Sequence, residues 1–130
     1  MFYKIIKYLK NTPTVSEIKV IELIEEDSVK ILKLKIKLKD NSYLFITEVH
    51  TINHQKYSYH WQDETGNLLI RWDNSPHWKN IKTFPHHKHI GSEVLPSTRV
   101  TIEDVFQEIE RYWITKEKSE KIKEGKNRNN

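Results

Sequence analysis

The stretch KYSYHWQDETGNLLIRWD, residues 56–73, decides how this chain folds. Two runs that alternate aromatic and polar residues flank the sequence DETG, residues 63–66, which is typical of a four-residue hairpin loop. If Gln62 faces Asn67 across the two strands, all the large apolar side chains fall on one face of the hairpin, and a one-residue slip would scatter them. The pairs predicted on that face are Trp61 with Leu68, Tyr59 with Ile70, and Tyr57 with Trp72.

The other face of the predicted hairpin is polar and is left free by the core. It carries Ser58, His60 and Gln62 beside Leu69, Arg71 and Asp73. In this register His60 and Arg71 are diagonal neighbours, roughly 7–8 Å apart at Cβ and within reach of long side chains. We therefore expect an imidazole and a guanidinium side by side on a rigid, accessible surface.

Three further β-type runs precede the hairpin, at residues 17–24, 29–39 and 42–50. The middle run alternates leucine or isoleucine with lysine, which is the period-two pattern of a half-buried strand. The apolar residues Phe2, Ile5, Ile6 and Leu9 recur at helical spacing, so we predict a short amphipathic N-terminal helix, with a strand as the alternative because so short a helix is marginal alone. After the hairpin we expect irregular chain, with a short extended piece near residues 81–84.

The last element is a helix. Thr101 is a good N-cap residue, and Asp104 stands where a capping box places its acidic partner. The apolar residues Ile102, Val105, Phe106, Ile109 and Trp113 follow on one stripe. The predicted fold class is α+β, a single antiparallel sheet of about five or six strands with a short N-terminal helix and a C-terminal helix packed on one face.

Composition narrows the possible classes of protein. The 130 residues suit one domain, which we place at residues 1–113, followed by a basic helix end and a disordered tail at 114–130. The net charge is +4, and residues 114–130 hold six Lys/Arg against three Glu, which suggests an acidic or nucleic-acid partner.

The chain has no cysteine and no long apolar run, and lysines interrupt its apolar N-terminal segment. We therefore expect no disulfide, thiolate metal site, membrane span or signal peptide, and a cytoplasmic location.

All seven histidines lie between His50 and His89, and three of the four tryptophans share that window. The motifs YHWQ (59–62), RWDNSPH (71–77) and FPHHKH (84–89), followed by EDV (103–105), resemble the TumE family, toxin components of prokaryotic toxin–antitoxin pairs. The resemblance covers roughly residues 29–110 and implies a cytosolic toxin with a cognate antitoxin partner, for which action on RNA is the common suggestion. One departure is visible, because the family often has His-His where this chain has His77-Trp78.

The histidine-rich window also suits RNA cleavage without a metal. Imidazoles can move protons near neutral pH, and Arg or Lys can stabilise the charge on a phosphorane. Our first choices are His60 and Arg71 on the free hairpin face, with Asp73 either orienting an imidazole or capping a turn. The complete set of catalytic candidates is His60, Arg71, Asp73, His77, His86, His87, Lys88 and His89. We predict no cofactor.

Two other hypotheses stay open. His87 and His89 alternate in an extended segment and point the same way, so with His77 they would give three imidazole ligands and a metal-dependent hydrolase or nuclease. Alternatively the whole cluster is a non-catalytic interface for nucleic acid or for the antitoxin. The structural roles that compete with chemistry are ordinary ones: a salt bridge from Arg71 to Asp73 or Glu48, and loop hydrogen bonds for residues 86–89.

Overall fold

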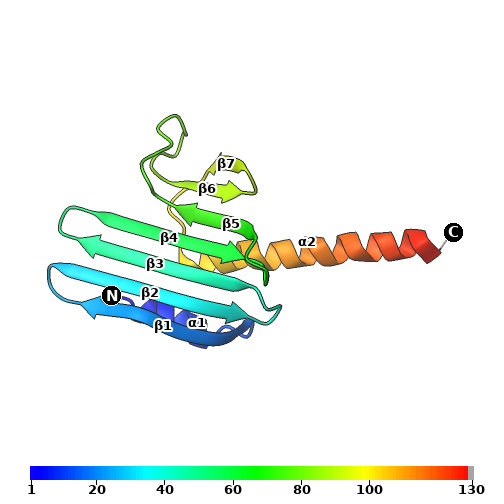
Figure 1. Cartoon of the computed structure of the whole chain (residues 1–130), viewed down its shortest axis with the longest axis horizontal. Coiled ribbons are helices and arrows are strands. Elements are labelled where there is room, and N and C mark those ends of the chain that lie inside the picture. The colour runs from blue at the N-terminus through cyan, green and yellow to red at the C-terminus, as the bar shows by residue number, and fades with distance from the viewer. Residues whose placement is uncertain (129–130) are drawn as a thin grey trace. The chain divides into compact units, whose positions relative to one another are not determined.

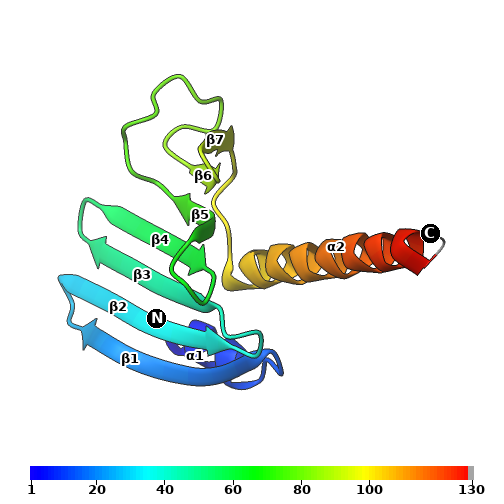
Figure 2. The same cartoon turned by 45° about the vertical axis from the view of Figure 1, so that its right-hand side comes forward.

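A computed structural model describes residues 1–128, with side chains described through residue 125. The chain divides into two compact units, Met1–Arg99 and a second one that begins at Val100. The first unit holds a short helix and a sheet whose strands, seven within the described residues, follow one another in chain order (Figures 1 and 2). The elements are α1 Tyr3–Lys10, β1 Val15–Glu25, β2 Val29–Leu38, β3 Tyr43–Thr51, β4 Gln55–Gln62, β5 Leu68–Asp73, β6 His87–Ile90, β7 Glu93–Pro96 and α2 Ile102–Arg128.

The predicted fold class is confirmed, with one correction to the sheet. Every neighbouring pair of strands is antiparallel, and the sheet has seven strands rather than five or six. The extended piece predicted near residues 81–84 is wrong, because those residues form bends and turns. Extended chain lies instead in β6 and β7, joined by a tight turn in which Gly91 has φ of 59°. A left-handed conformation of this kind favours glycine.

Alternation along β2 and β3 separates a buried face from a half-exposed face. The buried side chains on these strands include Leu32, Leu34, Ile36, Leu44 and Ile46, all at most 1% exposed. The lysines between them on β2 are half-buried. Strand pairing keeps the two faces distinct across the whole sheet, because antiparallel partners point to the same side. We call the half-exposed side the open face.

The hairpin from β4 to β5 keeps its predicted faces but not its predicted register. Tyr59 pairs with Trp72 and Trp61 with Ile70, so each partner lies two residues later than predicted. The cause is the loop: the Asp63 carboxylate accepts hydrogen bonds from the backbone N–H groups of Thr65 and Asn67, at 3.0 and 2.9 Å. A register irregularity between Trp61 and Gln62 then absorbs the mismatch. A shift of two residues leaves every side chain on its original face.

Both terminal helices form as the sequence indicates. In α1 the helical spacing buries Leu9, and Phe2 just before the helix is buried too. Before α2, the Thr101 N–H donates to the Asp104 carboxylate at 2.9 Å, and the Asp104 N–H donates to the Thr101 hydroxyl at 3.2 Å, which completes the capping box. Ile102, Val105, Phe106 and Ile109 are buried.

The basic C-terminal segment continues α2. Its side chains are exposed from Ile114 to Gly125, and the helix runs to Arg128. The part of the predicted disordered tail at residues 129–130 lies outside the described residues. Among residues 1–128, no helix combines the length and the apolar character needed to cross a bilayer.

Candidate functional site

Three charged or titratable side chains stand in a row across the open face. His60 on β4 pairs with Arg71 on β5, and Arg71 pairs with His89 on β6. His60 and Arg71 are thus direct partners, closer than the diagonal neighbours predicted from the sequence. Because adjacent strands lie about 4.8 Å apart, the two imidazoles flank the guanidinium with their backbones roughly 10 Å apart.

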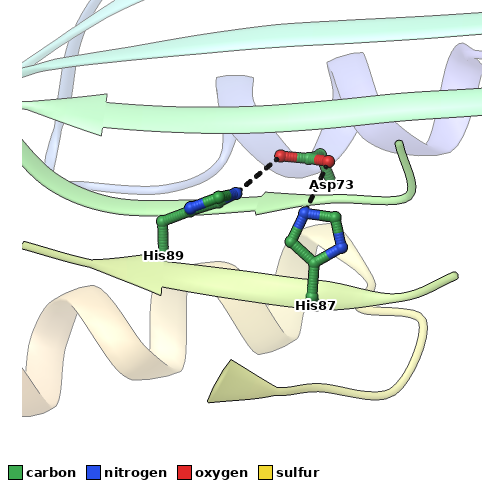
Figure 3. Close-up of side chains that lie close together, drawn as sticks. All are labelled: Asp73, His87 and His89. Atoms are coloured by element: carbon green, nitrogen blue, oxygen red, sulfur yellow. Dashed lines mark ion pairs between the residues drawn. The ribbon is translucent and has the colours of Figure 1, made fainter. Parts of the chain in front are cut away.

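The Asp73 carboxylate contacts two members of this row, Arg71 and His89. Asp73 lies on the same face of β5, two residues beyond Arg71, and its side chain is only 4% exposed. One carboxylate oxygen, Oδ2, accepts from Arg71 Nε at 3.0 Å and lies 3.5 Å from His89 Nε2. The other oxygen, Oδ1, accepts from the Ser75 N–H at 2.9 Å and lies 2.9 Å from His87 Nε2. Figure 3 shows the carboxylate between the two histidines.

The charge state of Asp73 follows from these neighbours. Burial opposes ionisation, but the Ser75 N–H, the nearby His87 and Arg71 together hold the pKa of Asp73 below its ordinary value. The carboxylate therefore stays ionised at neutral pH. An ionised group at this position fixes the guanidinium of Arg71 through Nε.

The hydrogen bonds of His60 define its protonation state. Arg71 Nη1 lies 3.2 Å from His60 Nδ1, and a guanidinium can only donate, so Nδ1 accepts and carries no proton. The other nitrogen, Nε2, then donates to Gln62 Oε1 at 3.2 Å. Burial and the positive charge of Arg71 lower the pKa of His60, against a smaller opposite effect of Gln62. His60 is therefore a neutral imidazole at neutral pH.

His89 has a mixed environment. Its side chain is 21% exposed and faces the Asp73 carboxylate. The pKa of His89 lies below its ordinary value, because burial, His87 and Arg71 lower it more than the Asp73 carboxylate raises it. The carboxylate aims at Nε2, so a proton on that nitrogen points into the cluster.

His87 is the buried member, with a side chain 1% exposed. Its Nδ1 lies 2.9 Å from the Pro85 carbonyl oxygen, which can only accept, so Nδ1 carries a proton. Its Nε2 lies 2.9 Å from the Asp73 carboxylate but makes no hydrogen bond of acceptable geometry. A buried ring nitrogen without a hydrogen bond beside a carboxylate is a feature that a metal ion held between the two groups would account for.

The site is bordered by Trp78, from the turn-rich segment between β5 and β6. Its ring meets the rings of His87 and His89 edge-on, at centroid distances of 6.5 and 6.1 Å. The indole is 43% exposed. An exposed aromatic ring beside an acid–base cluster can stack on a flat ligand group.

Five of the eight predicted residues come together: His60, Arg71, Asp73, His87 and His89. The other three lie elsewhere. Lys88 pairs with Trp72 on the opposite face of the sheet. His86 hydrogen-bonds the Tyr57 hydroxyl at 2.9 Å, and His77 is exposed in the turn-rich segment.

The ligand set predicted for a metal also changes. Within residues 1–128, Asp73, His87 and His89 can place their ligand atoms within 4.8 Å of one another, whereas His77 does not join this group. One carboxylate and two imidazoles are donors that suit zinc or a similar transition metal. The nearby Arg71 adds positive charge, which opposes a cation there.

A second polar cluster lies on the buried face and was missed in the sequence analysis. The buried Glu48 accepts from the Tyr59 hydroxyl at 2.6 Å and from Arg99 Nη2 at 3.0 and 3.1 Å, and it lies 2.7 Å from His50 Nε2. The sequence did carry a signal for this cluster. Glu48 falls on the apolar side of its strand, in step with Leu44 and Ile46, and such a carboxylate needs buried partners.

These features define a small α+β protein with an Arg–His–Asp cluster on an accessible sheet face. The chain matches the family described as Toxin TumE over residues 5–114, and it belongs to the TumE toxin family. The match begins inside α1, so the N-terminal helix, which we had placed outside the resemblance, is part of the family region. No curated protein and no solved structure matches the chain.

Proposed function

We propose that this toxin cleaves RNA at the row His60–Arg71–His89, without a metal. The observation that supports the proposal best is the order of the row, in which one guanidinium stands between two imidazoles. A phosphate bound over Arg71 would have a proton acceptor on one side and a proton donor on the other. This is the arrangement that attack by the 2′-hydroxyl on the adjacent phosphorus requires.

His60 is the general base in this scheme. Its neutral Nδ1 accepts from Arg71 Nη1 in the free protein. When Arg71 turns its Nη groups to the phosphate, the lone pair on Nδ1 is freed to take the proton of the 2′-hydroxyl. Substrate binding and base activation are thereby linked through one side chain.

His89 is the general acid, and Asp73 is a positioning residue. The Asp73 carboxylate lies 3.5 Å from His89 Nε2, where it orients the ring, and it holds Arg71 through Nε. The 2′-oxygen attacks phosphorus, the bond from phosphorus to the 5′-oxygen breaks, and the imidazolium form of His89, oriented through Nε2, protonates that oxygen from Nδ1. The products are a 2′,3′-cyclic phosphate and a 5′-hydroxyl, and the proton lost to His60 balances the proton given by His89.

The test uses purified toxin and a defined RNA in the presence of EDTA. We expect products with a 2′,3′-cyclic phosphate, and no cleavage when the nucleotide before the cut carries 2′-deoxyribose. His60→Ala and His89→Ala should each slow cleavage, while His54→Ala, at an exposed position between β3 and β4, should not. RNA that stays intact with the wild-type toxin, with or without divalent metal, would refute the proposal.

A second candidate function rests on His87. The buried Nε2 without a hydrogen bond, close to Asp73, fits a metal-dependent nuclease in which Asp73, His87 and His89 hold the ion. Such an ion would supply an activated water or polarise the phosphate. Metal analysis of protein purified without a histidine tag separates the two candidates. Stoichiometric metal and loss of cleavage in EDTA would favour the metal enzyme.

The proposed reaction does not use every residue that the sequence analysis named as a candidate. His77, His86 and Lys88 have no role in the scheme. We further propose that a cognate antitoxin restrains the toxin in the cytosol, where RNA is available. Co-purification of the product of a neighbouring gene, with loss of RNA cleavage in the complex, would test this part.

A further inference from the structure

The open face carries a second feature, a lysine-rich hollow at the far end of the sheet from Asp73. The hollow has a volume of about 300 Å³ and lies over β1, β2 and β3. It is lined by Glu17, Ile18, Lys19, Lys35, Lys37 and Tyr43. Three lysines against one glutamate make it cationic.

The strand register fixes where this hollow lies relative to the candidate active site. Lys35 pairs with Phe45, Phe45 with His60, and His60 with Arg71. Three strand spacings separate Lys35 from Arg71, which is roughly 14 Å. The hollow and the row are therefore parts of one continuous surface within the unit Met1–Arg99.

Aromatic rings lie between the hollow and the row. The Lys35 ammonium is 4.7 Å from the centroid of the Tyr43 ring and 5.9 Å from that of Phe45. Phe45 in turn meets the His60 ring edge-on at 6.2 Å. Tyr43 pairs with Gln62, the residue that holds His60 Nε2.

Cations alternating with half-exposed aromatic rings are the surface that proteins use to hold single-stranded nucleic acid. Lysines bind successive phosphates, and bases stack on the rings. Not every lysine on this face is equivalent, because Lys33 forms an ion pair with Glu22 at 3.5 Å. In the hollow, Lys37 pairs across the strands with Glu17, and Lys35 pairs with another lysine, Lys19. Two like charges held side by side favour an anionic ligand between them.

We infer that the hollow is a substrate subsite, in which Lys35 and Lys37 bind phosphates of a single RNA strand whose next nucleotides cross Phe45 to reach Arg71. This inference rests on the proposed function and extends it, since it names the substrate as single-stranded and gives the strand its path. Tyr43 supplies a stacking platform for a base next to those phosphates. Lys19 adds positive charge at the outer edge.

The experiment measures binding separately from cleavage. The probe is a short fluorescent oligoribonucleotide that is fully 2′-O-methylated, so it has no 2′-hydroxyl to attack phosphorus. Affinity is measured by anisotropy over a range of salt concentrations for the wild type, for Lys35→Gln/Lys37→Gln, and for the control Lys4→Gln/Lys10→Gln on α1. The two double variants remove equal charge, and Lys4 and Lys10 are exposed.

For single strands the slope of log affinity against log salt decreases by about 0.7 for each phosphate that the protein no longer neutralises. We therefore expect Lys35→Gln/Lys37→Gln to lower the slope by about 1.4 and to weaken binding at low salt, while the control keeps the wild-type slope. Equal slopes in the two double variants, or no wild-type binding at low salt, would overturn the inference.

The outcomes separate this inference from the proposed reaction. If the toxin cleaves RNA but both double variants bind and cleave alike, the subsite is wrong and the reaction stands. If the probe binds through Lys35 and Lys37 but RNA is never cleaved, the subsite stands and the reaction is wrong. Duplex RNA competing as well as a single strand would also contradict the subsite.

Discussion

Two buried carboxylates, Asp73 and Glu48, stand on opposite faces of the same sheet, and each has an arginine and a histidine beside it. Each residue is 3% exposed. The difference lies in how their arginines are held. Arg99 contacts both Glu48 oxygens through Nη2 and lies 3.9 Å above the Tyr57 ring, whereas Arg71 contacts Asp73 through Nε and reaches only an imidazole with Nη1.

This contrast separates a structural centre from one that can act on a ligand. Glu48 binds the Tyr59 hydroxyl, Arg99 and His50, so it ties the segment before α2 to the sheet. Asp73 holds Arg71 through Nε, and the side chains of Arg71 and His89 remain 36% and 21% exposed on the open face. A carboxylate that joins separate segments stabilises the fold, and a carboxylate that orients an arginine and a histidine on one sheet face can position them for a substrate.

The largest expected effect is on catalysis. Replacing His60 or His89 by alanine should slow RNA cleavage by about 10²–10⁴-fold, which is the usual contribution of a general acid or base. His50→Ala at the Glu48 centre is the matched variant and should leave the rate per folded molecule within a few-fold of wild type. Initial rates and thermal unfolding are measured on the same preparations. If His60→Ala were as active as His50→Ala, the proposal that the Asp73 cluster is catalytic and the Glu48 cluster structural would be wrong.

The next largest effect is on stability. Glu48→Gln removes the charge that pairs with Arg99, and breaking a fully buried pair costs about 3–5 kcal/mol. Because the Arg99 side chain is 39% exposed, we expect a smaller loss of about 2–3 kcal/mol in the free energy of unfolding. Urea unfolding measures it. The folded fraction should still cleave RNA, and loss of cleavage without loss of stability would place chemistry at Glu48 instead.

The sequence predicted the faces of the sheet better than its edges. Period-two alternation placed Tyr59, Trp61 and Trp72 in the core and His60 and Arg71 on the open face, because a side chain's face depends only on parity. The register was predicted wrongly because the Asp63 side chain fixes the conformation of the loop, and the alternation of apolar and polar residues in the strands carries no information about the loop. The sequence analysis treated His87 and His89 as part of an extended segment, which is β6, but it did not pair this segment with β5 and it missed β7, because both strands are short and HHKH carries almost no apolar signal.

The same reasoning explains which parts of the site could be anticipated. The neighbours His60 and Arg71 follow from one local hairpin, so the pattern of that hairpin contains them. Asp73, His87 and His89 meet only because β6 pairs with β5 across a turn-rich connection. Glu48 and Arg99 are 51 residues apart in the sequence, and no local pattern in either segment indicates which residue the other will contact.

A smaller effect concerns the titration of His60. Burial and Arg71 lower its pKa, so we expect its imidazole to titrate below the ordinary value of about 6.5. Between the two pKa values the unfolded chain binds more protons at this position, so His60 makes stability rise with pH in that window. Histidine NMR titration measures the value. In Arg71→Gln the pKa of His60 should move upward, and an unchanged or lower value would contradict the hydrogen bond between them.

The smallest expected effect belongs to Tyr57, which joins His86 to the Arg99 side of the Glu48 centre. Burial raises the pKa of Tyr57 to about 12, so its hydroxyl stays protonated and bonds His86 Nδ1 at 2.9 Å. Tyr57→Phe removes this one hydrogen bond but keeps the ring beneath Arg99, so the free energy of unfolding should fall by only about 1 kcal/mol. Tyr59→Phe is the matched change and should cost more, because its hydroxyl donates to the ionised Glu48 at 2.6 Å. Urea unfolding of the pair ranks the two bonds, and an equal or reversed order would mean that Glu48 does not organise its face of the sheet.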